Sequence, residues 1–451
     1  MPMRTIIEPF RIKVVEPLRF TTREERVEVL ERAHYNPFFI HADDVLIDLL
    51  TDSGTSAMSQ EQWSGIMRGD ESYAGSESYW RLKREVMDLT GFSEFIPTHQ
   101  GRAAEKILFS LIGGPGQTVI ANTHFDTTRA NVEQSGAKAV DCPSPESRDL
   151  FAPAPFKGNL DVEALHREIE QAGAENVPVV IVTVTNNSGG GQPVSMANLR
   201  AVREACDQYG IPFFLDSCRF AENAWFIRER EEGYENRTLR EISQEMFRLA
   251  DGATFSGKKD ALVNIGGFLA LNDEELARRA RNMLILTEGF PTYGGMAGRD
   301  LEAMAIGLRE VVHHDYMDYR IATSRYLCDG LVERGVPVIQ PPGGHAAYVD
   351  ARRTLPHIPV EQFPGQALVN AIFEIGGVRG VEIGTVMFGE HAKNDLVRLA
   401  LPRRVYTQSH IDYVLEVFED LVAERDRVPG YRMTYEPPFL RHFTAHFEPV
   451  R

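Results

Sequence analysis

Two adjacent lysines, Lys258 and Lys259, stand between a glycine and an aspartate in the segment SGKKDALVNIGGF. Upstream, Asp216 ends the apolar segment IPFFLD, and Arg219 follows it closely. Taken singly, an aspartate at a strand end can cap the next helix, and paired lysines are usually solvated charges. Together, a strand-end aspartate and a later Ser-x-Lys-Lys match the chemistry of a lysine that holds pyridoxal phosphate (PLP) as a Schiff base.

The reason for this match is electrostatic. A carboxylate beside the pyridine nitrogen keeps that nitrogen protonated, so the ring can accept the electrons released when a substrate loses its Cα proton. The lysine must be near-neutral to attack the aldehyde of PLP, and a second ammonium next to it favours the neutral form. The pattern therefore predicts Asp216 at the ring nitrogen and one lysine of the pair as the covalent ligand.

These residues need a scaffold of parallel strands. Between about residues 90 and 270, short apolar runs alternate with amphipathic segments, and QTVIANTHF, NVPVVIVTVTN and IPFFLDS are typical of strands buried on both faces. Between the last two, Ser195 is placed to cap a helix that Gly210 would end. The apolar face of that helix would comprise Leu199, Val202 and Cys206. A strand, a crossover helix and another strand predict a doubly wound α/β sheet.

A second, smaller α+β domain is expected from about residue 330, where GVPVIQPPGGHAAYVDARR and DLVRLALPRR carry fewer apolar strands. The predicted division is an N-terminal arm (1–18), a part of the small domain (19–45), a large PLP-binding domain (46–311) and a small C-terminal domain (312–451). Ligands of open α/β sheets gather at the carboxyl ends of the strands, often near a domain junction. The chemistry is expected there.

Composition narrows the possible partners. The chain has 451 residues, 43% of them hydrophobic, and a formal net charge of −17. This charge argues against binding to a nucleic-acid backbone, and no signal peptide or membrane-spanning run is present in the sequence. The four cysteines show no metal-binding spacing, so we expect reduced thiols in a cytoplasmic protein.

Long motifs along nearly the whole chain carry a resemblance. They are EPFRI, IDLLTDSGT, GDESYAGS, PTHQGRAAE, GGQPVSMAN, SGKKDALVNIGGF, YGGMAGRD, LPRRVYT and LRHFTA. The sequence resembles the aromatic amino-acid β-eliminating lyases, which are PLP-dependent enzymes of the aspartate aminotransferase-like fold (fold type I). The resemblance implies a large domain with a mixed, mainly parallel sheet, a small α+β domain, and a homotetramer built from dimers with shared active sites.

The resemblance also implies a cofactor set. Lys259 would form the covalent link, with Lys258 as its basic neighbour, and Asp216 would pair with the pyridinium. The remaining cofactor residues would be Gln100, Gly101, Arg102, Phe125, Asn187, Arg219 and Ser256. Among these, Gln100, Gly101, Arg102 and Ser256 would bind the phosphate. Phe125 would stack on the ring and Asn187 would face the ring hydroxyl, although Asn187 alone would pass for a turn residue.

Substrate and cation sites follow from the same resemblance. Arg403 would bind the substrate carboxylate, with Thr51 and Ser53 beside it, although a lone arginine is more often solvated. A monovalent cation such as potassium would be held by oxygen ligands at a subunit interface. Its ligands would come from Gly54, Glu71 and Asn264.

Residues around the leaving group resemble those of the tryptophan-cleaving members of the family. Asp126 stands where tyrosine-cleaving members carry threonine, and Ile383 stands where they place an arginine. Asp126 and His442 would form a hydrogen-bonded pair at the indole end, and Phe290 would suit a ring without a hydroxyl. Tyr73 resembles the general-acid tyrosine, which is thought to come from the adjacent subunit.

The expected reaction is conversion of L-tryptophan and water to indole, pyruvate and ammonium. Some positions depart from the tryptophan-cleaving pattern, among them LVNIGG, NNSGGGQ and Trp225. Alternatives are cleavage of tyrosine to phenol, or elimination from a substituted tryptophan or an S-substituted cysteine, because a thiolate leaves more readily than a carbanion. An alternative from another class is a noncatalytic PLP-binding protein.

Overall fold

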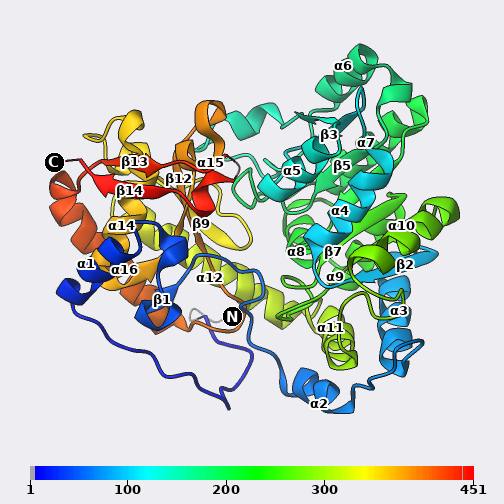
Figure 1. Ribbon diagram of the computed structural model, residues 1–451, viewed down its shortest axis with the longest axis horizontal. Coiled ribbons are helices and arrows are strands. Elements are labelled where there is room, and N and C mark those ends of the chain that lie inside the picture. The colour runs from blue at the N-terminus through cyan, green and yellow to red at the C-terminus, as the bar shows by residue number, and fades with distance from the viewer. Residues whose placement is uncertain (1–5, 439, 451) are drawn as a thin grey trace. The chain divides into compact units, whose positions relative to one another are not determined.

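The computed structural model describes residues 6–438 and 440–450 (Figure 1). The chain forms two compact units, which are described separately. The large unit is Ser53–Arg320, and the small unit falls within Met1–Asp52 and Ile321–Arg451. The helix α12 (His314–Glu333) runs through the point where the chain leaves the large unit.

The large unit is built on a seven-stranded sheet in the order β2-β8-β7-β6-β5-β3-β4. Its strands are β2 (Glu94–Thr98), β3 (Thr118–Ala121), β4 (Lys138–Asp141), β5 (Val180–Thr183), β6 (Phe213–Asp216), β7 (Gly252–Ser256) and β8 (Gly267–Leu271). The neighbours from β4 to β7 are parallel, whereas β8 is antiparallel to both β7 and β2. The predicted mixed, mainly parallel sheet is confirmed.

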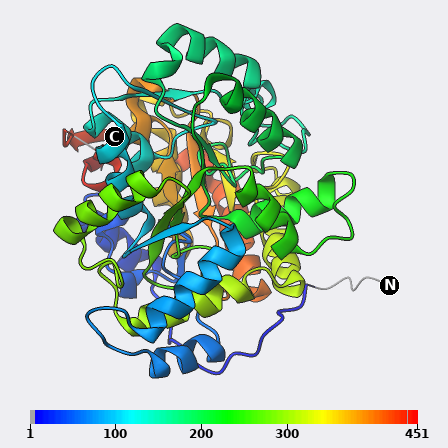
Figure 2. The ribbon, with the colours of Figure 1, turned by 90° about the vertical axis from the view of Figure 1, so that its right-hand side faces the viewer.

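Helices cover both faces of this sheet (Figure 2). They are α2 (Gln60–Arg68), α3 (Glu77–Thr90), α4 (Gly101–Ile112), α5 (Asp126–Gln134), α6 (Val162–Ala172), α7 (Met196–Tyr209), α8 (Phe220–Arg230), α9 (Leu239–Arg248), α10 (Glu274–Thr287) and α11 (Gly298–Glu310). One apolar cluster joins Leu108 of α4 and Leu284 of α10 to Ile181 and Leu269 of the sheet. The central strands β5, β6 and β7 are buried along their full length, and burial on both faces explains the apolar runs of β5 and β6.

The helix predicted between β5 and β6 is present as α7. The Ser195 side chain accepts a hydrogen bond from the Asn198 N–H (3.0 Å), and Gly210 ends the helix in the left-handed conformation. The three predicted apolar positions of its inner face are all buried. This crossover helix keeps β5 and β6 parallel, so both strands end at the same edge of the sheet.

The small unit has a three-stranded antiparallel sheet in the order β11-β12-β9, a parallel pair β1-β10 and the antiparallel hairpin β13-β14, drawn in red in Figure 1. These strands are β1 (Ile47–Asp48), β9 (Ala346–Asp350), β10 (Val378–Arg379), β11 (Val381–Ile383), β12 (Leu396–Ala400), β13 (Tyr431–Tyr435) and β14 (His446–Pro449). Its helices, besides its share of α12, are α1 (Arg23–Arg32), α13 (Ala351–Thr354), α14 (Pro364–Gly376), α15 (Thr385–Phe388) and α16 (Gln408–Glu424). One apolar core joins Leu368 of α14 and Val414 of α16 to Val397 of β12.

The four cysteines all lie within the described residues, and none forms a disulfide there. Among the helices of residues 6–438 and 440–450, none is both long and apolar enough to cross a membrane.

Candidate active site

The carboxyl ends of β5, β6 and β7 lie side by side in the large unit. Thr183 pairs with Asp216, and Asp216 pairs with Thr254, so β5 and β6 end in register and β7 continues two residues beyond them. Asp216 is the last residue of β6, and Ser256 is the last residue of β7. The predicted cofactor residues that follow these strands therefore start from one edge of the sheet.

Asp216 does not serve as the cap of the helix that follows it. The helix α8 begins after Arg219, and its Ala221 N–H donates to the Asp260 carboxylate at 2.8 Å. Asp216 is buried and instead accepts a hydrogen bond from the Cys218 thiol, with Sγ and Oδ1 2.9 Å apart. Because Asp260 takes the capping role, Asp216 can serve another function.

A second buried carboxyl lies close to Asp216 and was not identified from the sequence. Glu105 of α4 accepts a hydrogen bond from the Thr128 hydroxyl at 2.5 Å. Burial, and then the charge of Asp216, raises the pKa of Glu105 to about 8. The one available signal was its spacing of four residues from Gly101, which places both on the same face of α4.

The two lysines occupy the turn after β7. The Lys259 N–H donates to the Ser256 carbonyl (3.3 Å), and the Leu262 N–H donates to the Lys259 carbonyl (3.0 Å). Both lysine side chains are partly buried. Burial lowers the pKa of Lys258, and the charges of Lys259 and Arg102 lower it further. The charge of Lys259 therefore acts on its neighbour Lys258 in this turn.

The start of α4 packs closely against the end of β7. Gln100 is the N-cap residue of α4 and makes no side-chain capping hydrogen bond. A Cβ atom added to Gly101 would lie 2.7 Å from the Ser256 Cβ, so no larger residue fits there without displacement. Arg102 follows and is exposed. Amide groups at a helix start, a hydroxyl and a guanidinium suit a phosphate group.

Two loops bring the other predicted cofactor residues to this edge. Phe125 follows β3 and is the N-cap residue of α5, and Asn187 lies in the loop after β5 and is buried. The loops are joined because the Ser188 hydroxyl donates to the His124 carbonyl at 3.2 Å. Arg219 is buried beside the same loop, and its backbone N–H donates to the Val184 carbonyl at 3.2 Å.

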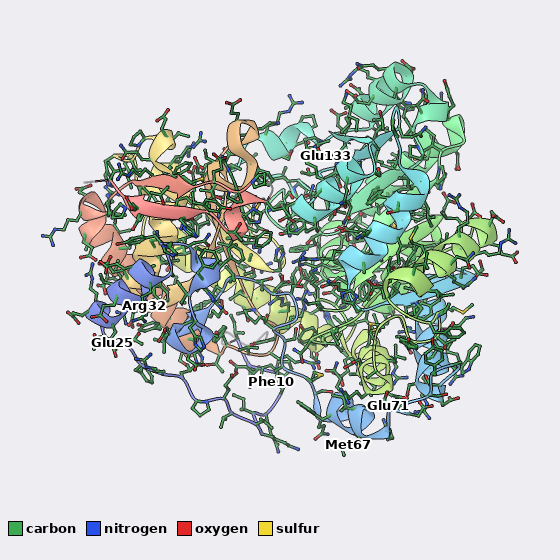
Figure 3. All side chains as sticks on the ribbon, viewed as in Figure 1. Phe10, Glu25, Arg32, Met67, Glu71 and Glu133 are labelled. Atoms are coloured by element: carbon green, nitrogen blue, oxygen red, sulfur yellow. The ribbon has the colours of Figure 1, made fainter. Side chains whose placement is uncertain are left out.

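The predicted cation ligands Gly54 and Asn264 lie together. The Asn264 amide donates to the Gly54 carbonyl (3.0 Å), and the Gly54 N–H donates to the Lys258 carbonyl (2.8 Å). Glu71, labelled in Figure 3, accepts a hydrogen bond from Gly298 at the start of α11 (3.1 Å). The described contacts therefore join Gly54 and Asn264 to each other and Glu71 to a different part of the large unit.

Tyr73 and Phe290 form an aromatic group on the surface of the large unit. Their ring centroids are 5.5 Å apart, and Tyr293 lies 5.6 Å from Tyr73. The Tyr73 residue is 72% exposed, so its ring is available to a neighbouring molecule.

In the small unit, Arg403 is buried rather than solvated. Its guanidinium donates to the Asp52 carboxylate at 2.8 Å, and both side chains are 1% exposed. Thr51 directly precedes this aspartate, whereas Ser53 belongs to the large unit. The pairing with Asp52 was not predicted, because the two residues lie 351 positions apart in the sequence.

The remaining predicted substrate residues of the small unit are also buried. Ile383 is the last residue of β11, and His442 lies in a short 3-10 helix (Arg441–Phe443). The His442 ring packs against Phe443, with centroids 3.9 Å apart. Asp126 belongs to the large unit and His442 to the small unit, so their pairing stays a prediction.

Known proteins of similar sequence cover almost the entire chain. A family model described as beta-eliminating lyase matches residues 48–416. A tryptophanase of Salinibacter ruber is 59% identical, over 99% of this chain and 96% of its own length. A tryptophanase of Hyphomonas neptunium is 57% identical, over 99% and 100%. A tyrosine phenol-lyase of Symbiobacterium thermophilum is 51% identical, over 98% of each chain.

Solved structures share the fold at much lower identity. A serine palmitoyltransferase of Sphingomonas wittichii has a TM-score of 0.61 and 16% identity, and the match covers 90% of this chain and 97% of that chain. The fold of the described chain is therefore that of PLP-dependent enzymes of fold type I.

Proposed function

Because this chain belongs to the β-eliminating lyase family, we propose that it is a PLP-dependent carbon–carbon lyase, a tryptophanase, that converts L-tryptophan and water to indole, pyruvate and ammonium. The observation that carries the proposal is the meeting of Asp216, Ser256 and the Lys259 turn at one edge of the parallel sheet. Similarity at 57–59% identity to tryptophanases supports tryptophan as the substrate.

The residues present fit PLP. The start of α4, which packs against Ser256 at Gly101, suits the phosphate, and the buried Asp216 carboxylate suits the protonated ring nitrogen. Lys259 would hold the cofactor covalently, Phe125 would face its ring, and Asn187, Arg102 and Arg219 would complete the polar set. PLP, when bound, supplies an electron sink for the carbanion formed at the substrate Cα.

Each remaining residue has a proposed task on the substrate. Arg403 would bind the carboxylate, with Thr51 and Ser53 beside it. Lys259, once displaced by the substrate amine, would take the Cα proton. Either Tyr73 or the Asp126–His442 pair would manage the proton that reaches the indole carbon. Apolar Phe290 and Ile383 would accept an aromatic ring without a hydroxyl.

We also propose a potassium ion held by Gly54, Glu71 and Asn264 at a subunit interface of a cytoplasmic homotetramer. The Gly54 and Asn264 contact and the exposed Tyr73 support this proposal. Oxygen ligands from backbone and side chains suit a hard monovalent cation.

The test is release of pyruvate from PLP-saturated protein in potassium buffer, with L-tryptophan, L-tyrosine and an S-alkyl-cysteine assayed side by side. We expect pyruvate and stoichiometric indole from tryptophan, and little pyruvate from tyrosine. Pyruvate from the cysteine derivative alone would assign the leaving-group residues to a thiolate. If the protein bound PLP but turned over none of these substrates, the proposal of an enzyme would be wrong and a noncatalytic PLP-binding protein would be favoured.

A further inference from the structure

The Asp141 carboxylate contacts residues on both sides of the consecutive pair Phe125 and Asp126. Asp141 is the last residue of β4, the edge strand that pairs in parallel with β3. Its Oδ1 atom accepts a hydrogen bond from the His124 backbone N–H (2.9 Å) and lies 2.7 Å from the Nδ1 atom of the same ring. Its Oδ2 atom accepts a hydrogen bond from the Arg129 guanidinium (2.6 Å).

These contacts reach residues on either side of the two predicted functional side chains. His124 immediately precedes Phe125, and Arg129 lies in the first turn and a half of α5, just after Asp126. Phe125 is the N-cap residue of α5 and contributes no side-chain capping hydrogen bond, whereas the Asp126 carboxylate accepts a hydrogen bond from the Thr127 N–H at 2.6 Å. Asp141 adds contacts from the neighbouring strand on both sides of this helix start.

The charge state of Asp141 suits this role. Burial opposes its ionisation, but the hydrogen bonds and charges of His124 and Arg129 outweigh burial and lower the pKa of the Asp141 carboxyl. An ionised carboxylate only accepts hydrogen bonds, so the His124 ring must carry its proton on Nδ1. The His124 side chain is fully buried, which immobilises the residue next to Phe125.

We propose that Asp141 is a positioning residue that sets Phe125 against the cofactor ring and Asp126 toward the leaving group. The inference rests on the proposed function, because the two side chains act on PLP and on the indole. Asp141 itself touches neither and acts through His124 and Arg129. A small displacement of a positioned group can lower turnover about a hundredfold.

The first test is Asp141→Asn in the PLP-loaded enzyme. An asparagine amide would place an N–H group against one of the present N–H donors, so at least one of the three contacts is lost. We expect the visible circular dichroism of the bound cofactor to fall by about half or more, because its asymmetric environment changes. We expect kcat/KM for tryptophan to fall about ten- to hundredfold. The fall for an S-alkyl-cysteine should be smaller, because a thiolate needs less help from Asp126.

Asp273→Asn is the matched control. Asp273 is also an aspartate of the large unit that accepts a backbone hydrogen bond, from Leu276 at 2.9 Å, as the cap of α10. It removes a carboxylate at a helix start without touching the 124–129 segment. We expect its cofactor dichroism and its ratio of the two substrates to equal those of the wild type.

Arg129→Gln tests the same inference if Asp141→Asn fails to fold. The Arg129 side chain is 33% exposed, so its loss leaves the core intact. We expect changes of the same direction and smaller size, since the His124 contacts remain. Unchanged dichroism in the folded variants, or equal losses with both substrates, would overturn the proposal. If the wild type released no indole, the proposed function would fail, while the dichroism would still decide whether Asp141 positions Phe125.

Discussion

In the large unit the candidate cofactor residues stand at the ends of buried strands, whereas in the small unit the candidate substrate residue Arg403 is held by a charge. Asp216 is placed by the register of neighbouring parallel strands, and Ser256 by the antiparallel pairing of β7 with β8. Arg403 is placed by the Asp52 carboxylate, with both side chains 1% exposed. The cofactor site therefore depends on backbone geometry and the substrate site on a buried ion pair, so the two should respond differently to substitution.

The largest expected effect comes from Lys259→Ala. This substitution leaves the strand ends of the large unit in place and removes the side chain that would bind PLP covalently. We expect the borohydride-reducible link to PLP to disappear and pyruvate release to fall by at least about 10⁴-fold, because both the covalent link and a proton-transfer group are lost. Lys258→Ala is the control and should retain the reducible link. A link that survives in Lys259→Ala and disappears in Lys258→Ala would reverse the assignment within the pair.

The ion pair of the small unit gives the next largest effect. Asp52→Asn removes the carboxylate that faces the buried Arg403 guanidinium, and loss of one member of such a pair costs about 3–5 kcal/mol. We expect a clearly lower Tm and a raised KM for the amino-acid substrate. The exposed pair Arg432–Glu448 provides the control, because Glu448→Gln should change the free energy of unfolding by less than about 1 kcal/mol. Equal Tm values for the two variants would show that Asp52 does not hold Arg403.

Substitution of Gly101 tests whether the close packing of α4 against β7 is needed to bind the cofactor. Gly101→Ala would place a Cβ atom 2.7 Å from the Ser256 Cβ and push the helix start away from β7. We expect the dissociation constant for PLP to rise about tenfold, as for the loss of one hydrogen bond to a charged group. Gly114→Ala is the matched control, because nothing lies within 4 Å of a Cβ atom built there. Equal PLP affinity in the two variants would contradict a phosphate site at the start of α4.

Local patterns in the sequence predicted the parts of the fold that local interactions determine. The strands β3, β5 and β6 have uninterrupted apolar sequences, and α7 has both Ser195 and Gly210 at its ends. The contacts missed were those between distant segments. Asp260 caps α8, and Asp52 pairs with Arg403, and neither partner can be read from its own neighbours. Glu105 alone carried a signal, its spacing from Gly101, but a helical glutamate is usually solvated.

Two buried glutamates, one in each unit, allow the two units to be compared at a single type of side chain. Burial raises the pKa of both Glu105 and Glu382 to about 8. Glu105 accepts a side-chain hydroxyl from Thr128, whereas both oxygens of Glu382 accept backbone N–H groups, from Val386 (3.0 Å) and Met387 (3.1 Å). The pKa of both carboxyls is thus raised, but Glu105 binds a side-chain hydroxyl whereas Glu382 binds backbone N–H groups.

The last prediction concerns stability and pH in the cofactor-free protein. Between the ordinary glutamate pKa and pH 8, each carboxyl is protonated when folded and ionised when unfolded, so unfolding releases a proton and stability falls as pH rises through this window. Glu105→Gln should lessen that fall and leave the Tm near pH 5 almost unchanged, because a glutamine carbonyl can accept the Thr128 hydroxyl. Glu382→Gln should destabilise at every pH by about 1–3 kcal/mol, because its new N–H₂ group faces a backbone N–H. Thermal unfolding of both variants at pH 5 and pH 8 measures the contrast. A loss of stability at pH 5 in Glu105→Gln as large as in Glu382→Gln would mean that Glu105 also holds its neighbours as an ionised acceptor.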